Sequence, residues 1–337
     1  MSSKTLTSWA LLIWKLLQQE QLDAAAIFKK AGLNPALLSD NNARYPVTGM
    51  YKLWSSAVAA TNDHSFGFRV GKEWSSTTFN ALGFAWLASG SLKEALYRLQ
   101  RYSKLVNNGI IIQFYRRDNV YILKFDTHDD HALIHPCARD AWLTAIIKMA
   151  RLLYGENFKP EQILLSGDYA NGPTAMENYV GCPLIYQQEE NLIVIAATIC
   201  EQQLLTADPE LALLSEQLLM TRLEQIDNSI TSQVRRIIHQ ELPNGELSEQ
   251  VVADQLHMSS RSLQRKLNDE QTNYQLLLTD ERKNLALSYI RSSQLSLNEI
   301  GYLLGFNNQA NFTRAFKSWF SQSPTDYRQT SQQLKAN

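Results

Sequence analysis

Two short segments near the C-terminal end carry basic, amide and hydroxyl side chains at the spacing of one exposed helical face. In the first segment these side chains belong to Arg261, Gln264, Arg265 and Lys266. In the second segment they belong to Gln309, Thr313, Arg314 and Lys317. Arginine pairs with guanine edges, glutamine with adenine edges and lysine with phosphates. Both segments therefore have the chemistry to bind nucleic acid, and neither contains an acidic residue among these positions.

The two segments occupy equivalent places in an internal repeat. Residues 247–258 match residues 295–306, and the match continues after one extra residue in the second copy. In each copy a short helix and a turn precede a second helix, which is anchored to the core by two apolar residues four positions apart. These anchors are Leu263, Leu267, Phe312 and Phe316. The pattern predicts two helix-turn-helix units whose second helices enter the major groove.

Polar residues at the helix starts support this interpretation, because serine and asparagine satisfy free N–H groups there. We expect four of them to cap helices and to lie near DNA phosphates, namely Ser248, Ser259, Ser296 and Asn307. The alternative is a set of ordinary amphipathic helices with solvated polar faces. Two copies in one register, each with caps and an acid-free second helix, favour DNA binding.

The first two-thirds of the chain has a different pattern. Helical periodicity extends to about residue 106, with helices expected at Leu6–Leu17 and, directly after Asp23, at Ala24–Ala31. A capping box is expected at Ser91 and Glu94. A hairpin is expected next, with strands Ile110–Tyr115 and Val120–Phe125 and a turn at 116–119. A long helix from Pro136 to Tyr154 and three short strands follow, the strands at Gln162–Leu165, Leu184–Tyr186 and Leu192–Ala196.

The expected architecture is an α+β N-terminal sensing domain, with helices and a small, mostly antiparallel sheet, followed by an all-α domain with two helix-turn-helix units. The expected boundaries are residues 1–205 for the first domain, 206–229 for a linker helix and 230–337 for the DNA-binding domain. In the linker helix, Leu211, Leu214 and Leu218 form a stripe that serves as a connector, a packing face or a dimer contact.

Bulk properties limit the class of protein. The chain has 337 residues, a net charge of −1 and three cysteines without a CxxC pair, which argues for a reducing compartment and against a disulfide framework. Its most apolar run, Leu192–Ile199, is too short to cross a bilayer. We expect a cytoplasmic protein without a membrane partner.

Other residues with reactive or metal-ligating side chains give weaker evidence for a functional site. His128, His131 and His135, with Asp129 and Asp130, are the densest potential metal ligands, but Pro136 places the histidines before a helix and not on one helical face. Cys182 has no neighbouring base to activate it and is interpreted as a structural thiol. No nucleotide-binding or hydrolase motif is present, so we expect no enzymatic activity, no metal and no cofactor.

The C-terminal region resembles the AraC/XylS family of bacterial transcription regulators over about residues 230–330. The most specific stretch is Gly305-Phe306, followed by Phe312-x-Arg314-x-Phe316-Lys317 and by Ser323-Pro324-x-x-Tyr327-Arg328. The resemblance implies two helix-turn-helix units joined by a long helix, here about Tyr274–Arg291, with both reading helices in successive major grooves.

The resemblance also implies which positions touch bases. They fall on Arg261, Gln264 and Arg265 in the first unit and on Gln309, Ala310, Thr313 and Arg314 in the second. Ala310 has no hydrogen-bonding side chain, so it either touches a thymine methyl group or does not read sequence.

The N-terminal part resembles the sensing domain of the "arabinose-binding" AraC subgroup. The similarity lies in Phe66-Gly67-Phe68-Arg69-Val70-Gly71, Leu82-Gly83-Phe84, Ser91–Leu96 and Arg101-Tyr102. The resemblance implies a regulator that binds double-stranded DNA and a small-molecule effector. The alternative is a ligand-independent regulator whose N-terminal domain only forms a homodimer or contacts RNA polymerase. An enzyme with a DNA-binding tail is a third hypothesis, for which we find no catalytic constellation.

Overall fold

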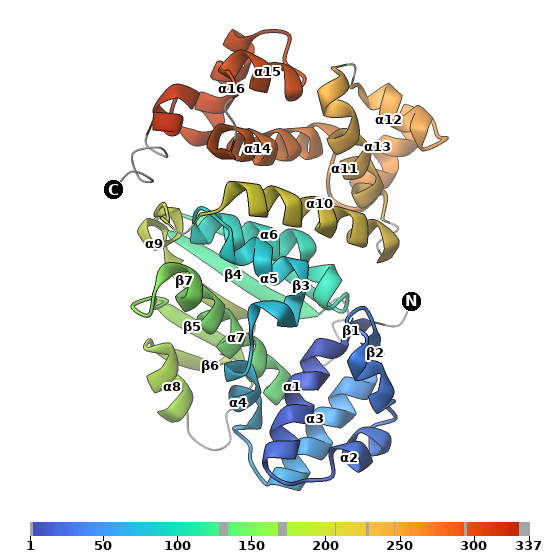
Figure 1. Ribbon diagram of the computed structural model, residues 1–337, viewed down its shortest axis with the longest axis vertical. Coiled ribbons are helices and arrows are strands. Elements are labelled where there is room, and N and C mark those ends of the chain that lie inside the picture. Colours follow the sequence, from blue (N-terminus) through green and yellow to red (C-terminus); the bar gives the residue numbers. More distant parts are fainter. Residues whose placement is uncertain are drawn as a thin grey trace. The chain divides into compact units, whose positions relative to one another are not determined.

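The computed structural model describes residues 3–127, 134–167, 174–205, 207–226, 229–245, 247–292 and 295–329. The chain divides into two compact units, Met1–Ala207 and Asp208–Asn337 (Figure 1). As predicted, the first unit combines helices with a small sheet and the second is helical.

The first unit begins with a helical region that also contains a small sheet. Its helices are α1 (Thr7–Gln19), α2 (Ala24–Lys30), α3 (Val47–Thr61), α4 (Phe66–Lys72), α5 (Ala81–Leu87) and α6 (Leu92–Val106), with short 3-10 turns at Pro35–Ser39 and Ser76–Phe79. Strands β1 (Lys4–Leu6) and β2 (Arg44–Pro46) pair antiparallel. The expectation of helices alone up to residue 106 is therefore wrong. These strands have three residues each, too few for an alternating pattern to reveal them.

A five-stranded sheet follows, in the order β3-β4-β7-β5-β6. The strands are β3 (Ile110–Arg117), β4 (Val120–Thr127), β5 (Gln162–Ser166), β6 (Leu184–Gln188) and β7 (Asn191–Ala196). The sheet is mostly antiparallel, as predicted, but β5 and β6 are parallel. Helix α8 (Thr174–Val180) lies between them in the sequence, which supplies the crossover that a parallel pair requires.

The hairpin turn is tighter than predicted. Arg116 and Arg117 are part of β3, and only Asp118 and Asn119 connect the strands. Asp118 adopts a left-handed conformation with φ of 52°, which the two-residue hairpin turn requires and which aspartate tolerates.

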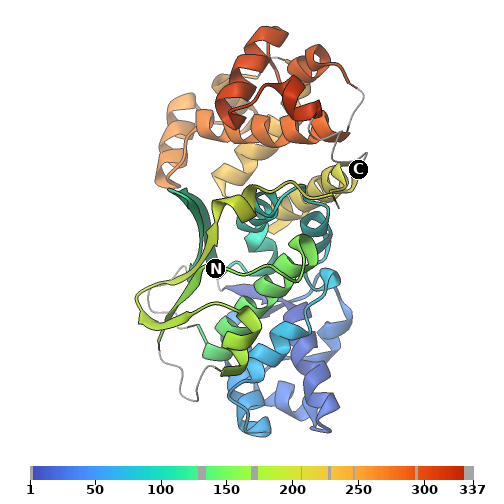
Figure 2. The ribbon, with the colours of Figure 1, turned by 90° about the vertical axis from the view of Figure 1, so that its left-hand side faces the viewer.

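One face of the sheet packs against helices. Helix α7 (Pro136–Tyr154) has the predicted bounds and ends at Gly155. Its Trp142 packs on Phe125 of β4, with ring centroids 4.1 Å apart. Figure 2 shows the strands on one side of this unit and the long green helix α7 on the other. The final short helix of the unit is α9 (Ala197–Glu201).

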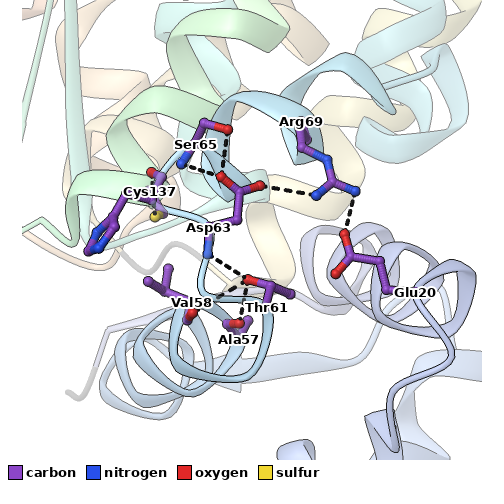
Figure 3. Close-up of polar contacts among 9 residues, drawn as sticks. Glu20, Ala57, Val58, Thr61, Asp63, Ser65, Arg69 and Cys137 are labelled. Atoms are coloured by element: carbon purple, nitrogen blue, oxygen red, sulfur yellow. Dashed lines mark hydrogen bonds and ion pairs between the residues drawn. The ribbon is translucent and has the colours of Figure 1, made fainter. Parts of the chain in front are cut away.

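A polar cluster joins the end of α1 to the start of α4 (Figure 3). Asp63 accepts hydrogen bonds from the backbone N–H and the hydroxyl of Ser65 and from Arg69. Arg69 also pairs with Glu20, at 2.5 Å. Burial opposes ionisation of Asp63, but these hydrogen bonds outweigh it and lower the pKa of the carboxyl group.

The second unit is helical. Its labelled helices are α10 (Pro209–Ile226), α11 (Ile230–Glu241), α12 (Glu249–Gln255), α13 (Ser260–Asp269), α14 (Tyr274–Ser292), α15 (Leu297–Leu303) and α16 (Gln309–Phe320), and residues 324–329 are helical as well. Helix α10 packs against α11 and α14 and belongs to this unit, whereas the leucines of its predicted stripe are exposed. Helix α14 lies between the α12–α13 pair and the α15–α16 pair (Figure 1).

Candidate nucleic-acid interface

Helix α13 presents one buried and one exposed face. Leu263 and Leu267 are fully buried. On the other side, four residues are exposed, namely Arg261, Gln264, Arg265 and Lys266. The helix starts at Ser259, whose hydroxyl accepts a hydrogen bond from the backbone N–H of Ser262 at 3.2 Å. Its partner helix α12 begins in the same way, with Ser248 accepting from Val251.

Helix α16 repeats this arrangement. Phe312 and Phe316 are fully buried, Thr313 is half-buried, and the exposed positions include Gln309, Ala310, Arg314 and Lys317. The Arg314 guanidinium donates to the side chain of Asn311 at 2.6 Å, which leaves other N–H groups of its fork available.

The cap of α16 differs from the prediction. Asn308, not Asn307, accepts the backbone N–H of Asn311, at 2.9 Å. The extra residue of the second repeat lies in the turn, so the helix starts one position later than the prediction assumed. Helix α15 has the expected start, where Ser296 and Glu299 form a reciprocal capping box.

The turns of the two units share a backbone feature. His257 and Gly305 occupy equivalent repeat positions, and both have positive φ, at 54° and 68°. This conformation ends the first helix and redirects the chain toward the reading helix. Ala253 and Gly301, also equivalent, are buried where the two helices of each unit approach one another.

The exposed cationic side chains of α13 and α16 have no carboxylate partner among the described residues. Within the described parts of the chain, no salt bridge involves Arg261, Arg265, Lys266, Arg314 or Lys317. Their charge is therefore available to phosphates and base edges.

The supporting residues of α14 were missed by the sequence analysis. The Glu281 carboxylate is almost fully buried and accepts a hydrogen bond from Arg235 of α11 at 3.0 Å. Arg282 donates to the backbone carbonyls of Leu304 and Gly305, at 2.9 and 3.1 Å, and its guanidinium lies 4.6 Å from the ring centroid of Phe306. Partners so distant in sequence leave no local signal.

The other candidate sites gain no support as metal centres. His128, Asp129, Asp130 and His131 lie outside the described residues. The Nδ1 atom of His135 accepts the backbone N–H of Cys137 at 3.2 Å and thereby caps α7. Among the residues that the structure describes, no three potential ligands gather to hold a metal ion.

Cys182 has the properties of a structural thiol, as the sequence predicted. Cys182 is free, and burial raises the pKa of its thiol to about 11, which keeps it protonated and unreactive. No described helix is both long and apolar enough to cross a membrane.

Comparison with known proteins agrees with this geometry. Residues 22–204 match the family model of the arabinose-binding domain of AraC transcription regulator, and residues 252–330 match a helix-turn-helix domain. The chain is 27% identical to the ornithine utilization regulator of Pseudomonas aeruginosa, over 96% of this chain and 95% of that protein. It is 26% identical to the regulator VirS of Mycobacterium tuberculosis, over 54% and 53% of the two chains.

Among solved structures, the regulator CdpR of Pseudomonas aeruginosa aligns with 20% identity and a TM-score of 0.48, covering 94% of this chain and 96% of that one. The two sequence relatives named here are transcription regulators. The family model of the N-terminal domain covers more than half of the chain, and the helix-turn-helix match covers both α13 and α16. The chain therefore belongs to the AraC family of DNA-binding transcription regulators.

Proposed function

We propose that this regulator reads two neighbouring stretches of double-stranded DNA with α13 and α16, and that its N-terminal domain binds a small-molecule effector that alters this reading. The observation that carries the DNA-binding half is the pair of cationic faces on α13 and α16. They have no carboxylate partner in the part of the chain that the structure describes, and the anchoring residues on the opposite face of each helix are fully buried.

The proposed roles differ between side chains. Base edges are contacted by Arg261, Gln264, Arg265, Gln309, Thr313 and Arg314, and Ala310 touches a thymine methyl group. Lys266 and Lys317 bind phosphates, as do the backbone groups near the capped starts of the helices. Ser248, Ser259 and Ser296 hold these starts in place.

The match to the arabinose-binding domain model over residues 22–204 supports the effector half of the proposal. The P. aeruginosa relative aligned along almost its whole length is named for ornithine utilization, so metabolites related to amino acids are the first effectors to test. The match favours an effector-responsive regulator over a ligand-independent one. We also propose that the protein works in the cytoplasm as a homodimer, contacts RNA polymerase and catalyses no reaction.

Footprinting of full-length protein on a duplex selected from random sequence tests the proposal. We expect protection of two adjacent major-groove segments, which changes when an effector is added. An Arg265→Ala/Arg314→Ala variant should lose this protection, whereas Lys29→Ala/Lys30→Ala, which removes exposed charges from α2, should keep it. Unchanged protection by the first variant would refute the assignment of the reading helices.

A further inference from the structure

Arg139 and Asp140 form a buried charged pair in the N-terminal unit. Both belong to the first turns of α7, and their exposed fractions are 5% and 1%. The Arg139 Nε donates to Oδ1 of Asp140 at 3.1 Å, and its Nη1 donates to the backbone carbonyl of Ser166. Ser166 is the last residue of β5, so the pair lies where α7 meets this end of the sheet.

Within the described residues, the Nη2 of Arg139 is buried without a hydrogen-bond acceptor. The ion pair of Asp140 with Arg139 is made by its Oδ1. Burial raises the pKa of Asp140 against the opposing charge of Arg139. An unpaired buried guanidinium N–H loses the hydrogen bonds that it would make in water, and an acceptor on a ligand would restore one of them.

The hydrogen bond from Arg139 to Ser166 ties α7 to β5, but it leaves Nη2 of Arg139 without an acceptor in the described residues. Apolar residues of similar size are often as stable as a buried ion pair, because they avoid the loss of solvation. The surroundings are nevertheless rigid and specific. The side chain of Asn191 accepts from both the backbone N–H and the hydroxyl of Ser166, at 2.9 and 3.1 Å, and so fixes the carbonyl that holds Arg139. Groups held in this way are typical of binding sites.

We propose that the Arg139–Asp140 pair binds the head group of a free α-amino acid. The α-carboxylate accepts from Nη2 of Arg139, because guanidinium groups bind carboxylates in preference to neutral acceptors. The α-ammonium group donates to Oδ2 of Asp140. The Nε–Oδ1 hydrogen bond of 3.1 Å holds the guanidinium and the carboxylate side by side, as recognition of one small head group requires.

Charge balance selects this class of ligand over simpler ions. Arg139 and Asp140 together are neutral, and a zwitterion keeps the buried site neutral. A lone carboxylate or a lone amine adds an uncompensated buried charge, which is costly. The inference rests on the proposed effector function and names the ligand class for it.

The test uses full-length protein and calorimetric titration with the protein amino acids and L-ornithine. For each amino acid that binds, two truncated analogues follow, the amine without the carboxylate and the acid without the α-amino group. For L-ornithine these are putrescine and 5-aminopentanoate. We expect each analogue to bind about tenfold more weakly or worse than the parent amino acid.

A matched pair of variants locates the site. Arg139→Met/Asp140→Leu removes both poles without leaving an unpaired charge, and should fold, bind DNA and lose the amino acid. The control Lys124→Met/Glu190→Leu removes an ion pair on the sheet of the same unit and should bind the amino acid as the natural chain does. Thermal unfolding shows whether the first variant folds. If it does not fold, titration of the natural protein with the truncated analogues tests the head-group recognition instead.

The outcomes separate this inference from the broader proposal. Equal binding of an amino acid by the natural chain and by Arg139→Met/Asp140→Leu overturns the site but keeps the effector function. Full-strength binding of either truncated analogue overturns the head-group recognition. If no amino acid binds while another metabolite changes the footprint, the ligand class is wrong and the effector function stands. If no metabolite binds or changes the footprint, both fail.

Discussion

Glu281 and Arg282 are consecutive residues of α14, yet they hold different helix-turn-helix units. Glu281 accepts a hydrogen bond from Arg235 of α11, which packs against α12 and α13. Arg282 binds the carbonyls of Leu304 and Gly305, in the turn before α16. One turn of α14 therefore fixes both reading helices relative to each other within the second unit. Such rigidity serves the proposed DNA reading, in which the two helices match the spacing of successive major grooves.

Replacing Arg282 should weaken the second unit selectively. Arg282→Met removes two hydrogen bonds to the turn and leaves buried carbonyls unpaired, which costs about 1–3 kcal/mol of unfolding free energy. We expect the DNA segment protected by α16 to lose more protection than the segment protected by α13. The footprints are measured under conditions in which the variant is folded. Lys283→Met, at the next position of the same helix, is the control. An equal loss of protection at both DNA segments would show that Arg282 acts on the stability of the whole second unit.

Arg265→Ala and Arg314→Ala should each reduce binding to the selected duplex by about 1–3 kcal/mol and relax base preference at one position. Lys317→Ala should weaken binding to all sequences alike and reduce the salt-dependence slope by about 0.9. Both predictions follow from the exposure of these side chains and their lack of carboxylate partners. Titrations at several salt concentrations, with specific and random duplexes, measure both quantities. Wild-type base preference in both arginine variants would contradict the assigned roles.

Features that depend on neighbouring residues could be predicted from the sequence. Ser259 lies next to the helix that it caps, and Leu263 and Leu267 are one turn apart, so local spacing revealed both the helix and its buried face. The same logic explains the one error in the caps. The repeat offset after the extra residue places the equivalent of Ser259 at Asn308, where the structure has the cap, and not at Asn307.

Features that depend on distant residues could not be predicted. The β1–β2 pair joins Thr5 to Tyr45, and the parallel β5–β6 pair joins Ile163 to Leu184. Arg139 and Asp140 look like two polar residues at the start of a helix until Ser166 and Asn191 are placed beside them. Nothing in the local pattern shows that these charges are buried.

Alanine should destabilise the protein strongly at one glycine and only slightly, or not at all, at another. A Cβ at Gly67 of α4 would lie 2.2 Å from the backbone carbonyl oxygen of Cys137 in α7, so Gly67→Ala forces the helices apart. We expect a loss of about 1–3 kcal/mol or more in unfolding free energy. A Cβ at Gly301 comes closest to the Phe312 side chain, at 3.3 Å, and Ala253 already occupies the equivalent position.

Gly301→Ala should therefore change the unfolding free energy by less than about 1 kcal/mol, because the entropy that alanine removes from the unfolded chain offsets a small rearrangement. Denaturant titrations of both variants measure the difference. A Gly67→Ala protein as stable as the natural chain would mean that α4 and α7 are not in contact at this position.

His135 should make the N-terminal unit lose stability in mild acid. Its ring stacks on Trp54, and its Nδ1 caps α7. Burial lowers its pKa to about 4 in the folded protein, against about 6.5 in an unfolded chain. Between these values the unfolded chain binds the proton and the folded chain does not, so stability is complete above pH 6.5 and falls as the pH drops toward 4.

His135→Asn keeps a side chain that caps helices well but cannot take up a proton in this range. Between pH 7 and pH 4.5, the thermal unfolding temperature of the variant should therefore fall less than that of the natural chain. Other groups titrate in the same range in both proteins, so the difference between the two profiles isolates His135. Parallel profiles would show that the ring takes up its proton as readily in the folded chain as in the unfolded one, and that its burial against Trp54 does not persist in solution.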